Sequence, residues 1–128
     1  MAKRKEFNPD PNDSFLRRRI IYNTKYSING LVSTFKNEEA FRIEIFLALI
    51  MIPLGFYLAP EGVSRLLLIG SIVLVLIVEL LNTGLENLVD RVSLEKHELS
   101  GRVKDQGSAA VFLSICLCGF VWIMILFF

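Results

Sequence analysis

Residues 66–90, LLLIGSIVLVLIVELLNTGLENLVD, hold the most informative pattern of the chain. The first thirteen of these residues carry no charge, and Glu79 then begins a polar series. Three further polar residues follow at helical spacing and share one helix face with Glu79: Asn82, Glu86 and Asp90. An ionisable group at membrane depth costs about 2.5–3.5 kcal/mol even on the lenient scale. The pattern therefore predicts that this face meets protein or a water-filled site and not lipid.

The depth of the polar groups indicates what such a face can do. At a rise of 1.5 Å per residue, counted from Arg65, Glu79 lies about 21 Å into the membrane and Glu86 about 31 Å. The stripe thus joins an apolar compartment to water. An enzyme needs this arrangement when one substrate is a lipid alcohol and the other is soluble and highly charged. The alternative is a polar contact between helices that holds an oligomer together.

The whole chain is typical of a small membrane protein. It has 128 residues, enough for one domain, and 53% of them are apolar. The formal net charge of +1 argues against nucleic acid as a partner. We expect residues 1–12 to form a disordered tail and the rest to form one all-α membrane domain. Its predicted elements are an amphipathic surface helix at 13–37 and transmembrane helices at about 40–59, 65–88 and 107–128.

Basic residues predict the orientation of the chain. Nine Lys and Arg precede the apolar run of the first span, which starts at Ile45, one (Arg65) follows the turn at Pro60-Glu61-Gly62, and four lie in the second loop, at 90–105. The positive-inside rule places the N-terminus and the second loop in the cytoplasm and the C-terminus outside. The apolar face of the surface helix suits the membrane interface, although packing against the chain's own spans is compatible with it. This face consists of Ile21, Ile28, Leu31, Val32 and Phe35.

Other charged residues allow two interpretations. Glu38 and Glu44 stand at the entry to the first span, where an ion pair between Glu38 and Arg42 competes with a functional role. The second loop is rich in charge, but such loops are normally just solvated, and either Asp105 or Ser108 is a candidate cap for the third helix. The sequence has no Gly-rich phosphate loop, no protein-kinase motif and no Cys/His set with metal-ligand spacing. If the protein is a phosphotransferase, carboxylates and Mg²⁺ must therefore supply the electrostatic stabilisation.

Three blocks of the sequence resemble the small prokaryotic diacylglycerol kinase family. ELLNTGLENLVDR at 79–91 is similar to its E-[I/L]-[I/L]-N-[S/T]-x-[I/L]-E…V-D signature. HELSGR at 97–102, with the following KD and GSAAV, resembles its second block, and NEEAFR at 37–42 with Glu44 resembles its first. The spacing is consistent from Arg19 to the C-terminus.

The resemblance implies a homotrimer of three-span subunits in the bacterial inner membrane, with active sites shared between neighbouring subunits. This agrees with the expectation that three helices alone cannot enclose so polar a stripe. The implied reaction is the Mg²⁺-dependent transfer of the γ-phosphate of ATP to 1,2-diacylglycerol, which gives phosphatidate and ADP. An undecaprenol kinase of the same fold is the nearest alternative. A non-enzymatic membrane protein, such as a transporter subunit that uses Glu79 as a proton carrier, is a further one.

The resemblance also implies roles for particular residues. Glu79 would be the general base, and Glu38 and Glu86 would hold Mg²⁺. The nucleotide would contact Arg19, Tyr26, Glu38, Glu86, Glu95, Lys96, His97, Lys104 and Asp105. The lipid acceptor would contact Arg19, Ala40, Phe41, Arg42, Glu44, Glu79 and Ser108. Supporting polar groups would be Asn82 and Asp90.

Overall fold

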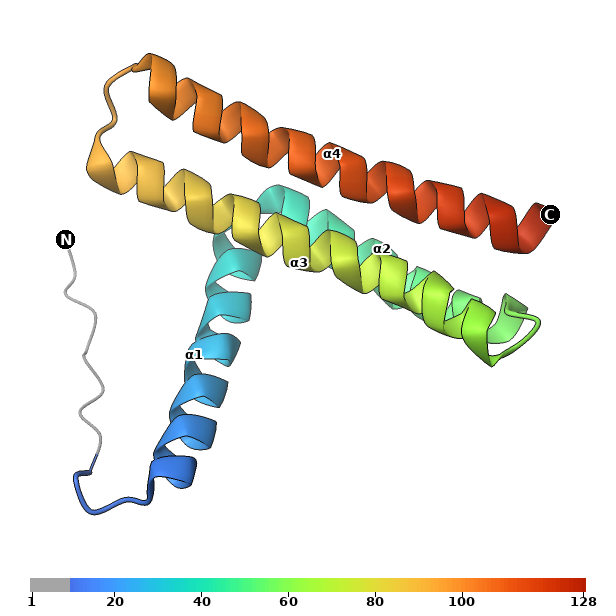
Figure 1. The fold of residues 1–128 in the computed structure, drawn as a ribbon, viewed down its shortest axis with the longest axis horizontal. Helices are drawn as coiled ribbons and strands as arrows, with labels where there is room; N and C mark the ends of the chain where they lie inside the picture. The colour runs from blue at the N-terminus through green and yellow to red at the C-terminus, as the bar shows by residue number, and fades with distance from the viewer. Residues whose placement is uncertain (1–9) are drawn as a thin grey trace. The chain divides into compact units, whose positions relative to one another are not determined.

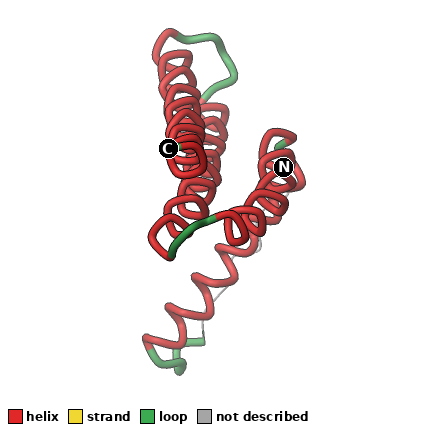
Figure 2. The backbone as a smooth tube through the Cα atoms, turned by 90° about the vertical axis from the view of Figure 1, so that its right-hand side faces the viewer, coloured by secondary structure: helices red, strands yellow, loops and turns green. Residues whose placement is uncertain are grey.

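The computed structural model describes residues 10–128, and these are organised as helices joined by short turns (Figures 1 and 2). Residues 1–9 of the predicted tail lie outside the described part of the chain. The helices are α1 (Phe15–Asn37), α2 (Glu39–Leu58), α3 (Gly62–Val92) and α4 (Glu98–Phe127). Three of them, α2, α3 and α4, are long and apolar enough to cross a membrane. The predicted all-α class with three spanning helices is therefore confirmed.

The chain forms two compact units, residues up to Ser33 and residues from Thr34 onward. The first unit contains most of α1, a helix in which no side chain is buried. Near its start, the Arg19 guanidinium lies 5.9 Å from the centre of the Phe15 ring. The apolar side chains of the predicted interfacial face are exposed on α1, so a surface role of this helix remains a prediction.

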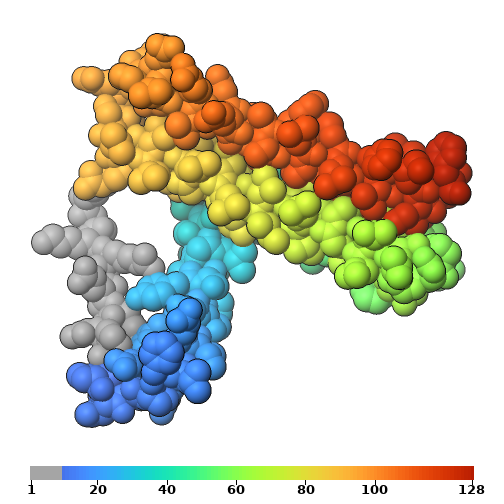
Figure 3. Space-filling view, in the orientation of Figure 1, coloured from blue at the N-terminus to red at the C-terminus, as the bar shows by residue number. Residues whose placement is uncertain are grey.

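Helix α3 is the centre of the second unit, and it packs against both α2 and α4 (Figures 1 and 3). The core contains Ala48 of α2, Leu68 and Ile72 of α3 and Trp122 of α4. The indole Nε1–H of Trp122 donates a hydrogen bond to the Leu68 carbonyl oxygen at 3.2 Å. Gly55 of α2 lies against the same indole and is buried, so a small residue lets α2 approach this contact closely.

Large apolar side chains cover the outer faces of α2, α3 and α4. In water this exposure would be unfavourable, but a hydrocarbon environment accepts it without cost. The 31 residues of α3 span about 46 Å at 1.5 Å per residue. Since the hydrocarbon core is about 30 Å thick, the polar end of α3 extends beyond it.

The structure changes the predicted boundaries at the second loop. Helix α4 begins at Glu98, nine residues before the predicted span, and the loop is restricted to residues 93–97. The His97 Nδ1 caps the helix by accepting the Leu99 backbone N–H at 3.1 Å, and an ion pair between Glu98 and Arg102 at 3.2 Å supports the first turns. Asp105 and Ser108 lie inside α4 and do not cap it, so that interpretation is wrong.

Candidate active site

The buried face of α3 changes from apolar to polar at Glu79. Apart from the adjacent pair Ser71 and Ile72, its buried residues recur every three or four positions: Ser64, Leu68, Ser71, Ile72, Val75, Glu79 and Thr83. Glu79 is only 7% exposed, so the same periodicity that packs α3 against its neighbours also carries this carboxyl group inside. The prediction that Glu79 faces protein is confirmed. One chain buries Glu79 but leaves Asn82 and Glu86 partly exposed and Asp90 exposed, which agrees with the expectation that three helices alone cannot enclose the whole stripe.

The remaining groups of the stripe become more exposed toward its end. Asn82 and Glu86 are half-buried, and Asp90 is exposed. The Asn82 Nδ2–H donates a hydrogen bond to Glu86 Oε1 at 3.4 Å. Asp90 Oδ1 pairs with the Lys104 ammonium group of α4 at 2.9 Å. The stripe therefore begins at a buried carboxyl group and ends at an exposed ion pair that joins α3 to α4.

Helix α2 brings two more acidic residues to this stripe. Glu38 is half-buried at the N-cap position of α2, and Glu44 is half-buried one to two turns later. Glu38 and Glu86 lie close enough to Glu79 for their charges to repel its carboxylate, and Glu79 acts on Glu44 in the same way. Carboxyl groups from two helices therefore converge around Glu79.

None of the ion pairs formed among residues 10–128 uses a carboxylate of this cluster, although the charge of Lys104, which is paired with Asp90, also acts on Glu86. The Arg42 guanidinium donates instead to the backbone oxygens of Phe35 and Lys36, each at 3.0 Å. The ion pair between Glu38 and Arg42 is therefore not formed, and that interpretation is wrong. The ion pairs found in this part of the chain use the carboxylates of Asp13, Glu98 and Asp90. The cluster thus carries an excess of negative charge.

The cluster suits a hard divalent cation delivered together with phosphate. In the described range, no three His, Cys, Asp or Glu side chains converge as a ready-made metal cage. Mg²⁺ does not require such a cage, because it is usually held by one or two carboxylates together with substrate phosphates and water. Glu44 Oε2 is buried without a hydrogen-bond partner, so one carboxylate oxygen of the cluster is left unsatisfied within the chain. Oxygen ligands and uncompensated charge fit the magnesium ion that the resemblance implies.

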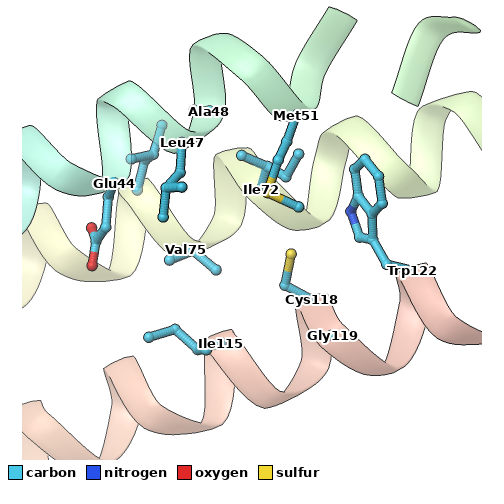
Figure 4. A pocket seen from close by; sticks show the side chains of 11 residues that line it. Glu44, Leu47, Ala48, Met51, Ile72, Val75, Ile115, Cys118, Gly119 and Trp122 are labelled. Atoms are coloured by element: carbon cyan, nitrogen blue, oxygen red, sulfur yellow. The ribbon is translucent and has the colours of Figure 1, made fainter. Parts of the chain in front are cut away.

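An apolar groove adjoins the cluster at Glu44. Residues of α2, α3 and α4 line it, and its volume is about 310 Å³ (Figure 4). Its α3 lining consists of Ile72, Val75 and Leu76, one turn before Glu79. Glu44 is the one charged residue in the lining and lies at one end of the groove (Figure 4). A groove of this kind can accept a hydrocarbon chain whose polar end lies near Glu44.

A second cavity, of about 340 Å³, lies at the polar ends of α3 and α4. Its lining contains Asp90 and four of the residues predicted to contact the nucleotide: Glu95, Lys96, His97 and Lys104. The short loop between the two helices makes this possible, because it folds residues 93–97 back beside the start of α4. Ser93, Ser100 and Gly101 also line the cavity and were not predicted from the sequence.

The other predicted site residues have different surroundings. Asp105 and Ser108 are exposed on α4 and line neither cavity, and Ala40 and Arg42 are exposed on α2. Phe41 is 1% exposed and packs in the interior. Arg19 and Tyr26 belong to the first unit, where Tyr26 lines an open cavity of about 530 Å³ with Asn29, Gly30 and Ser33. The proposed contacts of all these residues with ligands remain predictions.

Two residues near the cluster were not predicted from the sequence. Thr83 is 4% exposed, and its Oγ1 is buried without a hydrogen-bond partner. Its spacing of four residues from Glu79 is a signal that places it on the same helix face. Gly107 of α4 is buried against the side chain of Asn82. No sequence pattern indicates this contact, because it depends on which helix lies beside α3.

The fold and the site define a small α-helical membrane protein with an acidic centre between an apolar groove and a charged cavity. Residues 25–126 match the family model of prokaryotic diacylglycerol kinase. The chain is 56% identical over 109 residues to the diacylglycerol kinase of Haemophilus influenzae, covering 85% of this chain and 92% of that protein. It is 44% identical to the diacylglycerol kinases of Escherichia coli K12, over 84% of this chain and 88% of that protein, and of Pseudomonas aeruginosa, over 85% and 89%. The chain belongs to the prokaryotic diacylglycerol kinase family.

Proposed function

We propose that this protein transfers the γ-phosphate of ATP to the hydroxyl group of 1,2-diacylglycerol, giving phosphatidate and ADP. The relatives named above are diacylglycerol kinases, which supports this acceptor. The observation that carries the proposal is the order of features along α3. The apolar groove contacts residues 72–76, Glu79 is buried one turn later, and the charged cavity contacts Val89 and Asp90. A lipid alcohol and a soluble nucleotide would then approach Glu79 from opposite ends of α3, although Glu79 itself lines neither the groove nor the charged cavity.

Glu79 is the proposed general base. As the lipid oxygen attacks the γ-phosphorus, the hydroxyl proton passes to the Glu79 carboxylate, and the bond between the γ-phosphorus and the oxygen that bridges it to the β-phosphate breaks. ADP keeps the electron pair of that bond. Proton removal by a positioned base typically contributes about 10²–10⁴-fold to the rate. Burial holds Glu79 away from bulk water, so its carboxylate is available to the alcohol.

The nucleotide would occupy the charged cavity, with its phosphates directed toward the acidic cluster. Glu38 and Glu86 would hold Mg²⁺, which when bound supplies positive charge to the phosphate oxygens. Lys104 would add a second positive charge near the transferring group, and its ion pair with Asp90 at 2.9 Å fixes its position. Glu95, Lys96 and His97 would line the nucleotide in the loop.

The remaining assignments concern the assembly and the membrane. We propose a homotrimer in the bacterial inner membrane, with the N-terminus in the cytoplasm and the C-terminus outside. The large exposed apolar side chains of α2, α3 and α4 suit contacts with lipid and with further copies of the chain. Residues exposed on one chain would then complete a site shared with a neighbouring chain. In that site the nucleotide would contact Arg19, Tyr26 and Asp105, and the acceptor would contact Arg19, Ala40, Arg42 and Ser108.

The activity is tested directly with purified protein in mixed detergent–lipid micelles. We expect radioactive phosphate to pass from ATP to diacylglycerol when Mg²⁺ is present. Undecaprenol, offered at the same mole fraction, should be phosphorylated far more slowly. Faster phosphorylation of undecaprenol would make undecaprenol the acceptor in place of diacylglycerol. If neither lipid is phosphorylated, the kinase proposal is overturned.

Filling the apolar groove should weaken the acceptor site selectively. Gly119 lines the groove, and a side chain there would extend into open space. Because pocket contacts of this size are worth about 1–3 kcal/mol, Gly119→Phe should raise the KM for diacylglycerol by roughly tenfold or more and leave the KM for ATP unchanged. Gly70→Phe is the matched control, since Gly70 is exposed in α3 outside the groove. Equal effects of the two variants on the diacylglycerol KM would contradict an acyl-chain site in this groove.

A further inference from the structure

Gly107 makes a contact that no other glycine of the chain makes. A Cβ atom added at position 107 would overlap Oδ1 of Asn82 and would lie 3.2 Å from Asn82 Cγ. The two other glycines of α4, Gly101 and Gly119, would meet nothing within 4 Å. Gly107 is also buried. The backbone of α4 therefore lies directly against the amide of Asn82, and a side chain at position 107 would fit only if that amide moved.

This contact fixes the side-chain amide of Asn82, whose oxygen and nitrogen have different surroundings. Asn82 Oδ1 is buried and has no hydrogen-bond partner among residues 10–128. The opposite end of the amide, Nδ2, donates to Glu86 Oε1 at 3.4 Å. A hydrogen bond of this length is near the limit of useful geometry, so a displacement of a few tenths of an ångström is enough to break it.

We infer that Gly107 is a positioning residue for Glu86. The bare Cα of Gly107 sets the orientation of the Asn82 amide, and the amide in turn holds the Glu86 carboxylate by a hydrogen bond. This inference rests on the proposed function, in which Glu86 holds magnesium. Groups that orient a metal ligand typically affect metal affinity about 10–100-fold. Gly107→Ala should therefore displace Asn82 and weaken cation binding, although residue 107 contacts neither the cation nor the nucleotide.

Four proteins test the inference: wild type, Gly107→Ala, Asn82→Ala and the double variant. Binding of Mn²⁺ in the presence of a non-hydrolysable ATP analogue is measured by electron paramagnetic resonance, which requires no turnover. We expect Gly107→Ala to weaken Mn²⁺ binding by about tenfold, and the double variant to match Asn82→Ala. Once the Asn82 side chain is absent, an added methyl group at 107 has nothing to displace. Gly70→Ala, whose Cβ meets nothing within 4 Å, is the matched control and should bind like wild type.

Two results would overturn the inference. If the losses of Mn²⁺ affinity in the two single variants multiply in the double variant, Gly107 acts without Asn82. If Gly107→Ala lowers the thermal unfolding midpoint and leaves Mn²⁺ binding unchanged, the contact serves packing alone. Should Gly107→Ala fail to fold, Asn82→Ala must restore a folded double variant, and failure of this rescue overturns the clash itself. Absence of lipid phosphorylation in the wild type would instead count against the proposed function, since the Mn²⁺ comparison does not depend on it.

Discussion

Glu79→Gln is expected to lower kcat for diacylglycerol phosphorylation by about 10²–10⁴-fold, the usual contribution of a positioned general base. Glutamine keeps the size and the hydrogen-bonding oxygen of glutamate but cannot accept the hydroxyl proton. The KM for ATP should change little, because Glu79 belongs to neither the proposed metal ligands nor the loop cavity. Steady-state kinetics in mixed micelles, together with equilibrium binding of an ATP analogue, give both quantities.

Stability provides an independent check on the Glu79 variant. A buried amide costs less than a buried carboxylate, and the substitution also removes repulsion from Glu38 and Glu86. We therefore expect a thermal unfolding midpoint at or above that of wild type. A folded variant with nearly wild-type kcat would eliminate the general-base role. The Glu44→Gln variant serves as the comparison, since Glu44 lies in the same cluster but is proposed to contact the acceptor and not to remove its proton.

The spans and the buried face of α3 could be predicted from the sequence, because both follow from local periodicity. An apolar run of membrane length must form a helix in a bilayer. Glu79 could be predicted to face protein, because the free-energy cost of exposing its carboxylate to lipid is the same whichever protein groups would otherwise cover it.

The start of α4 could not be predicted in this way. Hydropathy detects only the part of a helix that lies in the membrane, and residues 98–106 are too polar to give that signal. They continue the helix for reasons that hydropathy does not measure, namely the His97 cap and the ion pair between Glu98 and Arg102. As a result, the predicted loop of 90–105 shrinks to five residues, 93–97. Lys104 then lies on a rigid helix and pairs with Asp90 across the gap to α3.

Contacts between helices were equally inaccessible to sequence reasoning. The approach of Gly107 to Asn82, and the convergence of Glu38 with the α3 stripe, depend on how α2 and α4 pack against α3. Residue spacing within one helix gives no information about such packing. The predicted ion pair between Glu38 and Arg42 could be excluded only from the structure, in which the Arg42 guanidinium hydrogen-bonds to backbone oxygens instead.

Glu86→Gln is expected to raise the Mg²⁺ concentration for half-maximal activity by at least about tenfold. Even groups that only orient a metal ligand usually cost about 10–100-fold in metal affinity, so loss of a ligand's charge should have no smaller effect. Glu38→Gln should act in the same direction, since Glu38 approaches the cluster from α2. At saturating Mg²⁺ the rate should recover in large part, because mass action compensates for weaker binding. Titration of activity with Mg²⁺ at fixed total ATP measures both effects.

Glu39→Gln is the matched control, because Glu39 is adjacent to Glu38 in sequence but exposed, whereas Glu38 is half-buried. If the metal is held by the cluster and not merely attracted by the overall charge of the α2 entry, Glu39→Gln must leave the Mg²⁺ requirement unchanged. Equal shifts in Glu38→Gln and Glu39→Gln would indicate nonspecific attraction and would remove Glu38 from the metal site. A loss of kcat in Glu86→Gln that Mg²⁺ cannot restore would assign Glu86 to the chemical step instead. The distinction matters because Glu79 and Glu86 lie on one face of α3, two turns apart, and only their different responses to Mg²⁺ separate the base from the ligand.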